Sequence, residues 1–228
     1  DGTLFFREPI PAYDANLNPV YIVAEYESDS KGEAKLTYGG RVATKLDSKT
    51  EVGVSHVHEG NAGREANLTG VDTTVNFNET TKLHAEVARS QRHGVDDSSS
   101  GGAYIVELTQ NETDHSLKAY ARKQDMGFGL GQQSTSATGT QKMGVEGQVK
   151  LNEDMTLQGT LSREQKETTE STADRTLAEA KLQWGKIGVG LRAINESDTT
   201  GQSSESRQLV ATASREMLDQ QLTLRASA

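Results

Sequence analysis

The feature that most constrains this chain is a persistent alternation of apolar and polar residues. Near residue 145, for example, Met143, Val145 and Val149 alternate with Glu146 and Gln148. A β-strand sends successive side chains to opposite faces, so this pattern predicts strands with one apolar and one polar face. The same alternation recurs in residues 34–46, 82–87, 117–122, 155–162 and 221–226.

The composition argues against an ordinary two-sided core. Only 33% of the 228 residues are hydrophobic and the net charge is −9, whereas a soluble domain has roughly 45–50% apolar residues. Such values lie near the threshold for intrinsic disorder, but an unfolded chain has no reason to alternate. The sequence therefore predicts sheets that need only one apolar face.

Several other classes of protein are disfavoured by simple counts. No apolar run reaches the ~18 residues of a transmembrane helix. The chain contains no Cys, which leaves neither a disulfide framework nor a zinc–thiolate site. An acidic chain without a basic cluster is a poor partner for nucleic acid.

Thirteen strands are predicted from the alternating segments. Two segments shift parity, residues 64–77 and the stretch near Val57, and we interpret these shifts as β-bulges. A helix competes for residues 170–183, but the alternation of Ala178 and Ala180 with Glu179 favours a strand. The predicted strands cover approximately residues 20–27, 33–46, 50–59, 65–77, 81–91, 102–111, 114–124, 140–151, 154–165, 174–184, 186–196, 206–217 and 220–228.

Short and long links alternate between these strands. Tight links such as Asn78-Glu79-Thr80 are followed by longer polar links, which are expected at residues 59–64, 91–102, 125–140, 165–174 and 196–206. Short turns at one end and long loops at the other are typical of transmembrane β-barrels, with the turns in the periplasm and the loops outside.

The predicted fold class is therefore all-β, an antiparallel up-and-down meander that forms a transmembrane β-barrel of about 12–14 strands or a portion of a larger barrel. Bacterial single-chain barrels have even strand numbers, so an odd count favours a portion. We expect residues 19–228 to form the barrel and residues 1–18 to be a periplasmic or plug-like lead-in.

The polar face carries charges of both signs, which a water-filled lumen would solvate and a dry interior would not. The residues expected to line this lumen are Lys35, Arg41, Lys45, Lys82, Glu86, Lys118, Arg122, Lys142, Glu146, Lys150, Glu179, Lys181, Arg192 and Arg225.

The chain resembles bacterial outer-membrane β-barrels across residues 20–228. In addition, Phe5-Phe-Arg-Glu-Pro-Ile10 followed by Asn18-Pro-Val-Tyr-Ile-Val23 is similar to the entry of the barrel region in very large Gram-negative surface proteins. The resemblance implies location in the outer membrane, contact with its lipid bilayer, and further strands from a longer chain or from other subunits.

The expected function is a polar passage, either a porin-like channel or a translocation and anchoring pore. A flat sheet with one solvated face shows the same alternation, so a soluble extracellular structural or adhesive module is an alternative. The aromatic girdle is thin, consisting of Tyr38, Phe77, Tyr104 and Trp184.

A barrel hydrolase is a third alternative, but the sequence singles out no catalytic residue near His84, His93 or His115. His56 and His58 share a strand face without an evident third metal ligand. We therefore expect no enzyme activity, no metal and no cofactor.

Overall fold

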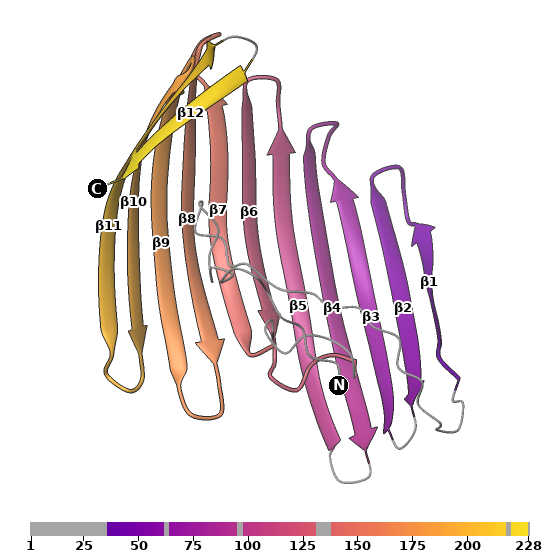
Figure 1. Cartoon of the computed structure of the whole chain (residues 1–228). Helices are drawn as coiled ribbons and strands as arrows, with labels where there is room; N and C mark the ends of the chain where they lie inside the picture. The colour runs from indigo at the N-terminus through magenta and orange to yellow at the C-terminus, as the bar shows by residue number, and fades with distance from the viewer. Residues whose placement is uncertain (1–35, 62–63, 95–97, 131–137, 218–219, 228) are drawn as a thin grey trace. The chain divides into compact units, whose positions relative to one another are not determined.

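Twelve β-strands follow one another in a single antiparallel sheet, in the order of the chain (Figure 1). This computed structural model describes residues 36–61, 64–94, 98–130, 138–217 and 220–227, which contain no helix. The sheet belongs to one unit, residues 34–228. The strands are β1 (Tyr38–Lys45), β2 (Thr50–Asn61), β3 (Arg64–Asn76), β4 (Thr81–Gly94), β5 (Ser98–Asn111), β6 (His115–Gln124), β7 (Thr140–Lys150), β8 (Met155–Glu167), β9 (Thr172–Trp184), β10 (Ile187–Asp198), β11 (Ser203–Met217) and β12 (Gln220–Ser227).

The predicted antiparallel meander is confirmed. Twelve of the predicted strands match β1–β12, and the segment that could have been helical is β9. The strand predicted at residues 20–27 and the lead-in at residues 1–18 lie outside the described residues. Over the described range, β1 and β12 are the two edges of the sheet and do not pair with each other, so the described sheet is not closed into a barrel.

Most of the expected long links are wrong. Strand β4 runs to Gly94 and β5 starts at Ser98, so most of residues 91–102 are paired. Strands β8, β9, β10 and β11 likewise extend into the expected links, and residues 125–139 alone form a long connection between described strands. Ser-, Thr- and Gly-rich segments lack the alternation that marks a strand, but their backbone groups still pair. The strands therefore continue well beyond their apolar parts.

The turns after β1, β3, β5, β7 and β9 lie along one end of the sheet, here called the short-turn end (Figure 1). At the other end, the connections at residues 168–171 and 199–202 are equally short. Three turns of the short-turn end share one hydrogen-bonding scheme. In the first, the Leu46 N–H donates to the carbonyl of Thr50 at 2.8 Å. Asp47 Oδ1 accepts the N–H groups of Lys49 at 2.7 Å and Thr50 at 2.8 Å, and these donors hold the pKa of Asp47 below its ordinary value. The matching turns are residues 77–81 and 151–155, with Asn78 and Asn152 in place of Asp47.

The predicted bulges are also wrong. Pairing of β3 with β2 and β4 is uninterrupted from Arg64 to Val75. Ala66 and Leu68 lie on the same face as Asp72, the face that carries most of the charged side chains. Ala66 is only 3% exposed. The change of parity therefore reflects a local apolar patch on the polar face, not an extra residue.

The strand ends are staggered in a regular way. Each strand residue lies directly opposite one residue of the next strand, and these pairs form rows across the sheet. The row that starts at Lys45, the last residue of β1, reaches Ser206 of β11 after ten steps from strand to strand. Ser206 lies eleven residues before Met217, where β11 ends. The hairpins thus shift by about one residue for each strand. In Figure 1 the short turns step along the sheet accordingly from the β1–β2 turn to the β5–β6 turn.

Candidate functional site: two opposite faces of one sheet

One face of the sheet, here called the apolar face, carries large hydrophobic side chains that nothing described covers. Val42, Val54, Val71, Val87 and Tyr104 lie directly opposite one another across β1–β5. Across the sheet, every strand residue among the exposed large hydrophobics belongs to this face. In the described part of the chain, only Ala66 and Ile194 are buried hydrophobic residues. The sheet therefore has no conventional hydrophobic core.

The apolar character is confined to the half of this face near the short turns. Further along the same strands the face becomes polar, because Tyr38 is followed across the sheet by His58, Asn67, Gln91 and Ser100. An apolar band is thus bordered by a polar band that continues to the strand ends.

The four aromatic residues of the expected girdle all belong to the apolar face. Phe77 and Trp184 lie at its short-turn side and are 50% and 63% exposed. Tyr104 marks the last apolar position of β5, and Tyr38 lies beyond the band, with its ring 5.0 Å from that of His58. The aromatic residues therefore border the apolar band on both sides.

The opposite face, here called the polar face, gathers the predicted lumen residues. The strand register places the following residues on this one face: Arg41, Lys45, Lys82, Glu86, Lys118, Arg122, Lys142, Glu146, Lys150, Glu179, Lys181 and Arg192. Whether they line a lumen stays a prediction. Arg225 pairs with Thr212 in β11, and Lys35 lies outside the described residues.

Charged side chains on the polar face form ion pairs across the strands. In the row that crosses β7–β10, Lys142 Nζ lies 3.2 Å from Glu164 and Arg175 Nε lies 3.0 Å from Glu196. Glu164 and Arg175 are direct neighbours in the register, so charge alternates along the row. Nearer the short turns, Arg192 pairs with Glu179. These pairs therefore join neighbouring strands on the polar face.

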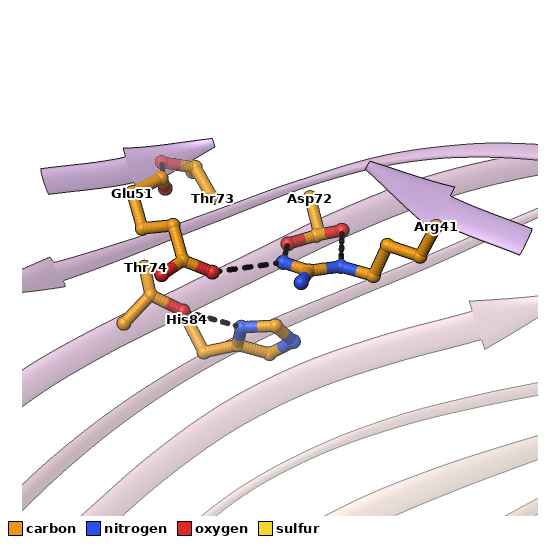
Figure 2. Close-up of polar contacts among 6 residues, drawn as sticks. All are labelled: Arg41, Glu51, Asp72, Thr73, Thr74 and His84. Atoms are coloured by element: carbon orange, nitrogen blue, oxygen red, sulfur yellow. Dashed lines mark hydrogen bonds and ion pairs between the residues drawn. The ribbon is translucent and has the colours of Figure 1, made fainter. Parts of the chain in front are cut away.

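A second cluster joins three strands at the β1 edge (Figure 2). Arg41 of β1 donates from Nε and Nη2 to the carboxylate of Asp72 on β3, at 2.9 and 2.5 Å. Its Nη2 also lies 3.1 Å from Glu51 on β2. Nearby, Thr74 Oγ1 and His84 Nδ1 are 3.2 Å apart.

Tyr120 is the large aromatic residue amid these charges. Lys118 Nζ lies 5.8 Å and the Arg122 guanidinium 5.9 Å from the centre of its ring, within the range of cation–π contacts. A Cβ on Gly144, directly opposite, would lie 2.8 Å from the Tyr120 hydroxyl. The glycine therefore leaves the space that this ring occupies.

Most of the acidic partners were not among the residues predicted for the polar face. Asp72 was hidden in the segment interpreted as bulged, and Glu164 and Glu196 sit near or in the segments expected to be loops. Glu107, which lies 2.8 Å from Lys118, follows the alternation of β5. Strand parity could have assigned Glu107 to the polar face, but only the register between strands identifies its partner.

The histidines considered for metal binding or catalysis are dispersed. His56 and His58 share a face, and their Nδ1 atoms lie 2.9 Å from Thr69 Oγ1 and 2.8 Å from Asn67 Oδ1. His115 Nδ1 lies 2.7 Å from Asp114 at a short turn. Among the described residues, no group of three or more metal-binding side chains occurs.

Comparison with known proteins gives no guide to identity. No family model, no curated protein and no solved structure matches this chain. In the parts of the chain that the structure describes, no helix is long and apolar enough to cross a membrane.

Proposed function

We propose that this sheet forms the wall of a bacterial outer-membrane β-barrel, with the apolar face against lipid and the polar face lining a water-filled passage. The observation that carries the proposal is that an apolar side chain is exposed while the charged side chain next to it in the chain is largely buried, the reverse of a soluble protein. Leu191 is 62% exposed, whereas the side chain of Arg192 is 10% exposed and paired with Glu179. A soluble protein buries the leucine and exposes the arginine.

The dimensions of the apolar band support contact with lipid. Alternate residues from Leu151 back to Met143 belong to the apolar face, which at ~3.3 Å per residue extends about 26 Å along the chain. A strand tilt of ~36° reduces this to roughly 21 Å, close to the ~25 Å band of outer-membrane barrels. In water, so extensive an uncovered surface would favour aggregation.

The stagger of the hairpins supports a barrel. In an eight-stranded barrel with a shear of eight, the ratio of shear to strand number is also one residue per strand, and the strands tilt by ~36°. Outer-membrane barrels have tilts of ~35–45°. A flat sheet that stacks on another protein has no need of this stagger.

Closure requires that the edges at β1 and β12 find partners. The β1 strand runs toward the short turns and β12 runs away from them, so the two edges are antiparallel to each other. Closure by direct pairing, or through further strands such as the one predicted at residues 20–27, would satisfy the backbone groups that lipid cannot.

The polar face fits a passage for water and polar solutes. A depression of about 380 Å³ between β5 and β8 is lined by polar side chains that include Lys118, Glu146, Gln148 and Gln158. At least twelve strands exceed the ~8 whose interior side chains fill a barrel. The passage would serve as a porin-like channel or as a translocation and anchoring pore.

Single cysteines in β7 provide the test, since the chain has no native Cys. Spin labels at Val145 and Val149 should be relaxed by lipid-soluble oxygen after reconstitution in vesicles, because these residues belong to the apolar face. Labels at Gln148 and Glu146, which are exposed residues of the polar face, should be relaxed by a water-soluble nickel chelate. Equal water access at all four sites would contradict the proposal and favour a soluble extracellular module.

A further inference from the structure

Residues 125–130, here called the strap, continue from β6 and then fold back over the sheet. The Asp125 N–H donates to the Gly102 carbonyl at 2.9 Å, and the Gly102 N–H donates to Asp125 Oδ2 at 2.8 Å. Phe128 then turns the chain by donating its N–H to the Asp125 carbonyl at 3.0 Å. The strap is thereby anchored to β5 at its start.

The strap lies on the polar face. The Gly129 N–H donates to Ser90 Oγ at 2.8 Å, and Ser90 is only 1% exposed. In the register, Ser90 lies directly opposite Gly101 of β5, and both belong to the polar face. The strap therefore covers β4 and β5, next to the apolar patch at Ala66 and Leu68.

Glycines allow this contact. A Cβ on Gly101 would lie 2.4 Å from the Phe128 nitrogen, and one on Gly127 would lie 2.6 Å from the Ser100 carbonyl oxygen. Gly129 has a φ of 127°, which side chains disfavour. The backbone of the strap therefore packs directly against the backbone of the sheet at these points, with no side chain between them.

The position of the strap relates it to the passage. Ser90 and Gly101 are each three residues beyond Val87 and Tyr104, the last apolar residues of their strands on the opposite face. In the proposed barrel, the strap lies inside the wall at the mouth opposite the short turns. We infer that the strap narrows this mouth and sets the size of solute that can enter, an inference that rests on the proposed function.

A single cysteine at Met126 tests the inference without disturbing the glycine contacts. Met126 is 45% exposed, so a cysteine there should accept a bulky charged thiol reagent. We expect modification of Met126→Cys to lower the single-channel conductance of the complete barrel in a planar bilayer. The same modification of Val145→Cys, on the apolar face, should leave the conductance unchanged.

Displacing the strap should have the opposite effect. In Gly101→Val the new side chain removes the space that the strap occupies, and we expect a higher conductance and passage of larger sugars in a liposome-swelling assay. Gly190→Ala is the matched control on the polar face, because its Cβ would meet no atom closer than 3.5 Å.

The outcomes separate the two proposals. If the wild-type protein conducts and Met126→Cys has the same conductance before and after complete modification, the proposed role of the strap is wrong but the passage stands. If Gly101→Val fails to fold, the measurement on Met126→Cys still decides the role of the strap. A wild-type barrel that inserts without conducting would instead contradict the passage itself, and the strap inference with it.

Discussion

The guanidinium of Arg41 reaches across an entire strand to the carboxylate of Asp72, with 2.5 Å between Nη2 and Oδ2 (Figure 2). The strand between them contributes Gly53, which lies directly opposite Asp72. A Cβ on Gly53 would lie 2.6 Å from both Arg41 Nη2 and Asp72 Oδ1. The ion pair thus depends on a residue that makes no side-chain contact of its own.

Gly53→Ala should therefore break the pair between Arg41 and Asp72 and lower the urea concentration at the midpoint of unfolding. The loss should largely vanish when Arg41→Ala is already present, because the guanidinium that needs the space is gone. Gly40→Ala is the control, since no atom lies within 4 Å of its added Cβ. An equal decrease in the urea midpoint from Gly53→Ala in both backgrounds would show that the methyl group destabilises the strand independently of the ion pair.

Charges should be tolerated on one face of β7 and not on the other. Val145→Arg places a charge in the middle of the apolar band and should cost ~2–4 kcal/mol of folding free energy in lipid. Gln148→Arg adds the same side chain to the polar face and should be close to neutral. Refolding into vesicles over a urea series measures both, and equal effects would refute the assignment of the faces.

The turn at Asp47 should weaken in acid. Two backbone N–H groups stabilise the ionised carboxylate and lower its pKa, so its contribution to turn stability is present above the unfolded pKa of ~3.9. That contribution is lost as the pH falls through the lower folded value. The protection of the Lys49 amide against hydrogen exchange, relative to its intrinsic exchange rate at each pH, should therefore fall below about pH 4.

Asp47→Asn is the matched variant, because Asn78 and Asn152 already make the corresponding bonds in two other turns. Its amide oxygen cannot be protonated in this range, so exchange at Lys49 should lose the acid-dependent step. An acid step of the same size in both proteins would assign it to another group.

The alternation in the sequence was enough to predict the meander, because successive side chains of a strand point to opposite faces and an apolar residue at every second position therefore marks one face. It could not predict where strands end in polar surroundings. Residues 98–101 are Ser-Ser-Ser-Gly, and nothing in their polarity distinguishes a loop from a paired strand with two wet faces.

The site could be predicted in outline only. Parity assigned Lys142 and Arg192 to the polar face, but each acidic partner depends on the register between strands. The parity change reflects apolar residues on the polar face, where Leu68 lies directly opposite Ser90, the residue whose hydroxyl accepts a hydrogen bond from the strap. Long-range packing of this kind leaves no signal in the local pattern.

The link between β10 and β11 should accept insertions that face outward. Asp198 Oδ1 accepts the N–H groups of Thr200 and Gln202, each at 2.9 Å, and Thr200 is exposed. An epitope inserted after Thr200 should bind antibody on intact cells, because the link lies at the same end of the sheet as the long connection of residues 125–139, and the long loops of outer-membrane barrels face outward. An epitope after Glu153, in a short turn, should bind only after the outer membrane is permeabilised. The reverse pattern would invert the topology.

Contact between the apolar face and lipid is tested most directly by the fluorescence of Trp184, the single tryptophan of the chain. Trp184 belongs to the apolar face, is 63% exposed and directly precedes the β9–β10 turn. In vesicles, its emission should shift to the blue and be quenched by lipids brominated near the headgroup more than by lipids brominated near the chain end. A Trp184→Phe, Gln183→Trp variant moves the fluorophore to the polar face, where aqueous iodide should quench it instead. Emission from Trp184 that is insensitive to brominated lipid and quenched by iodide would contradict a lipid-facing apolar surface.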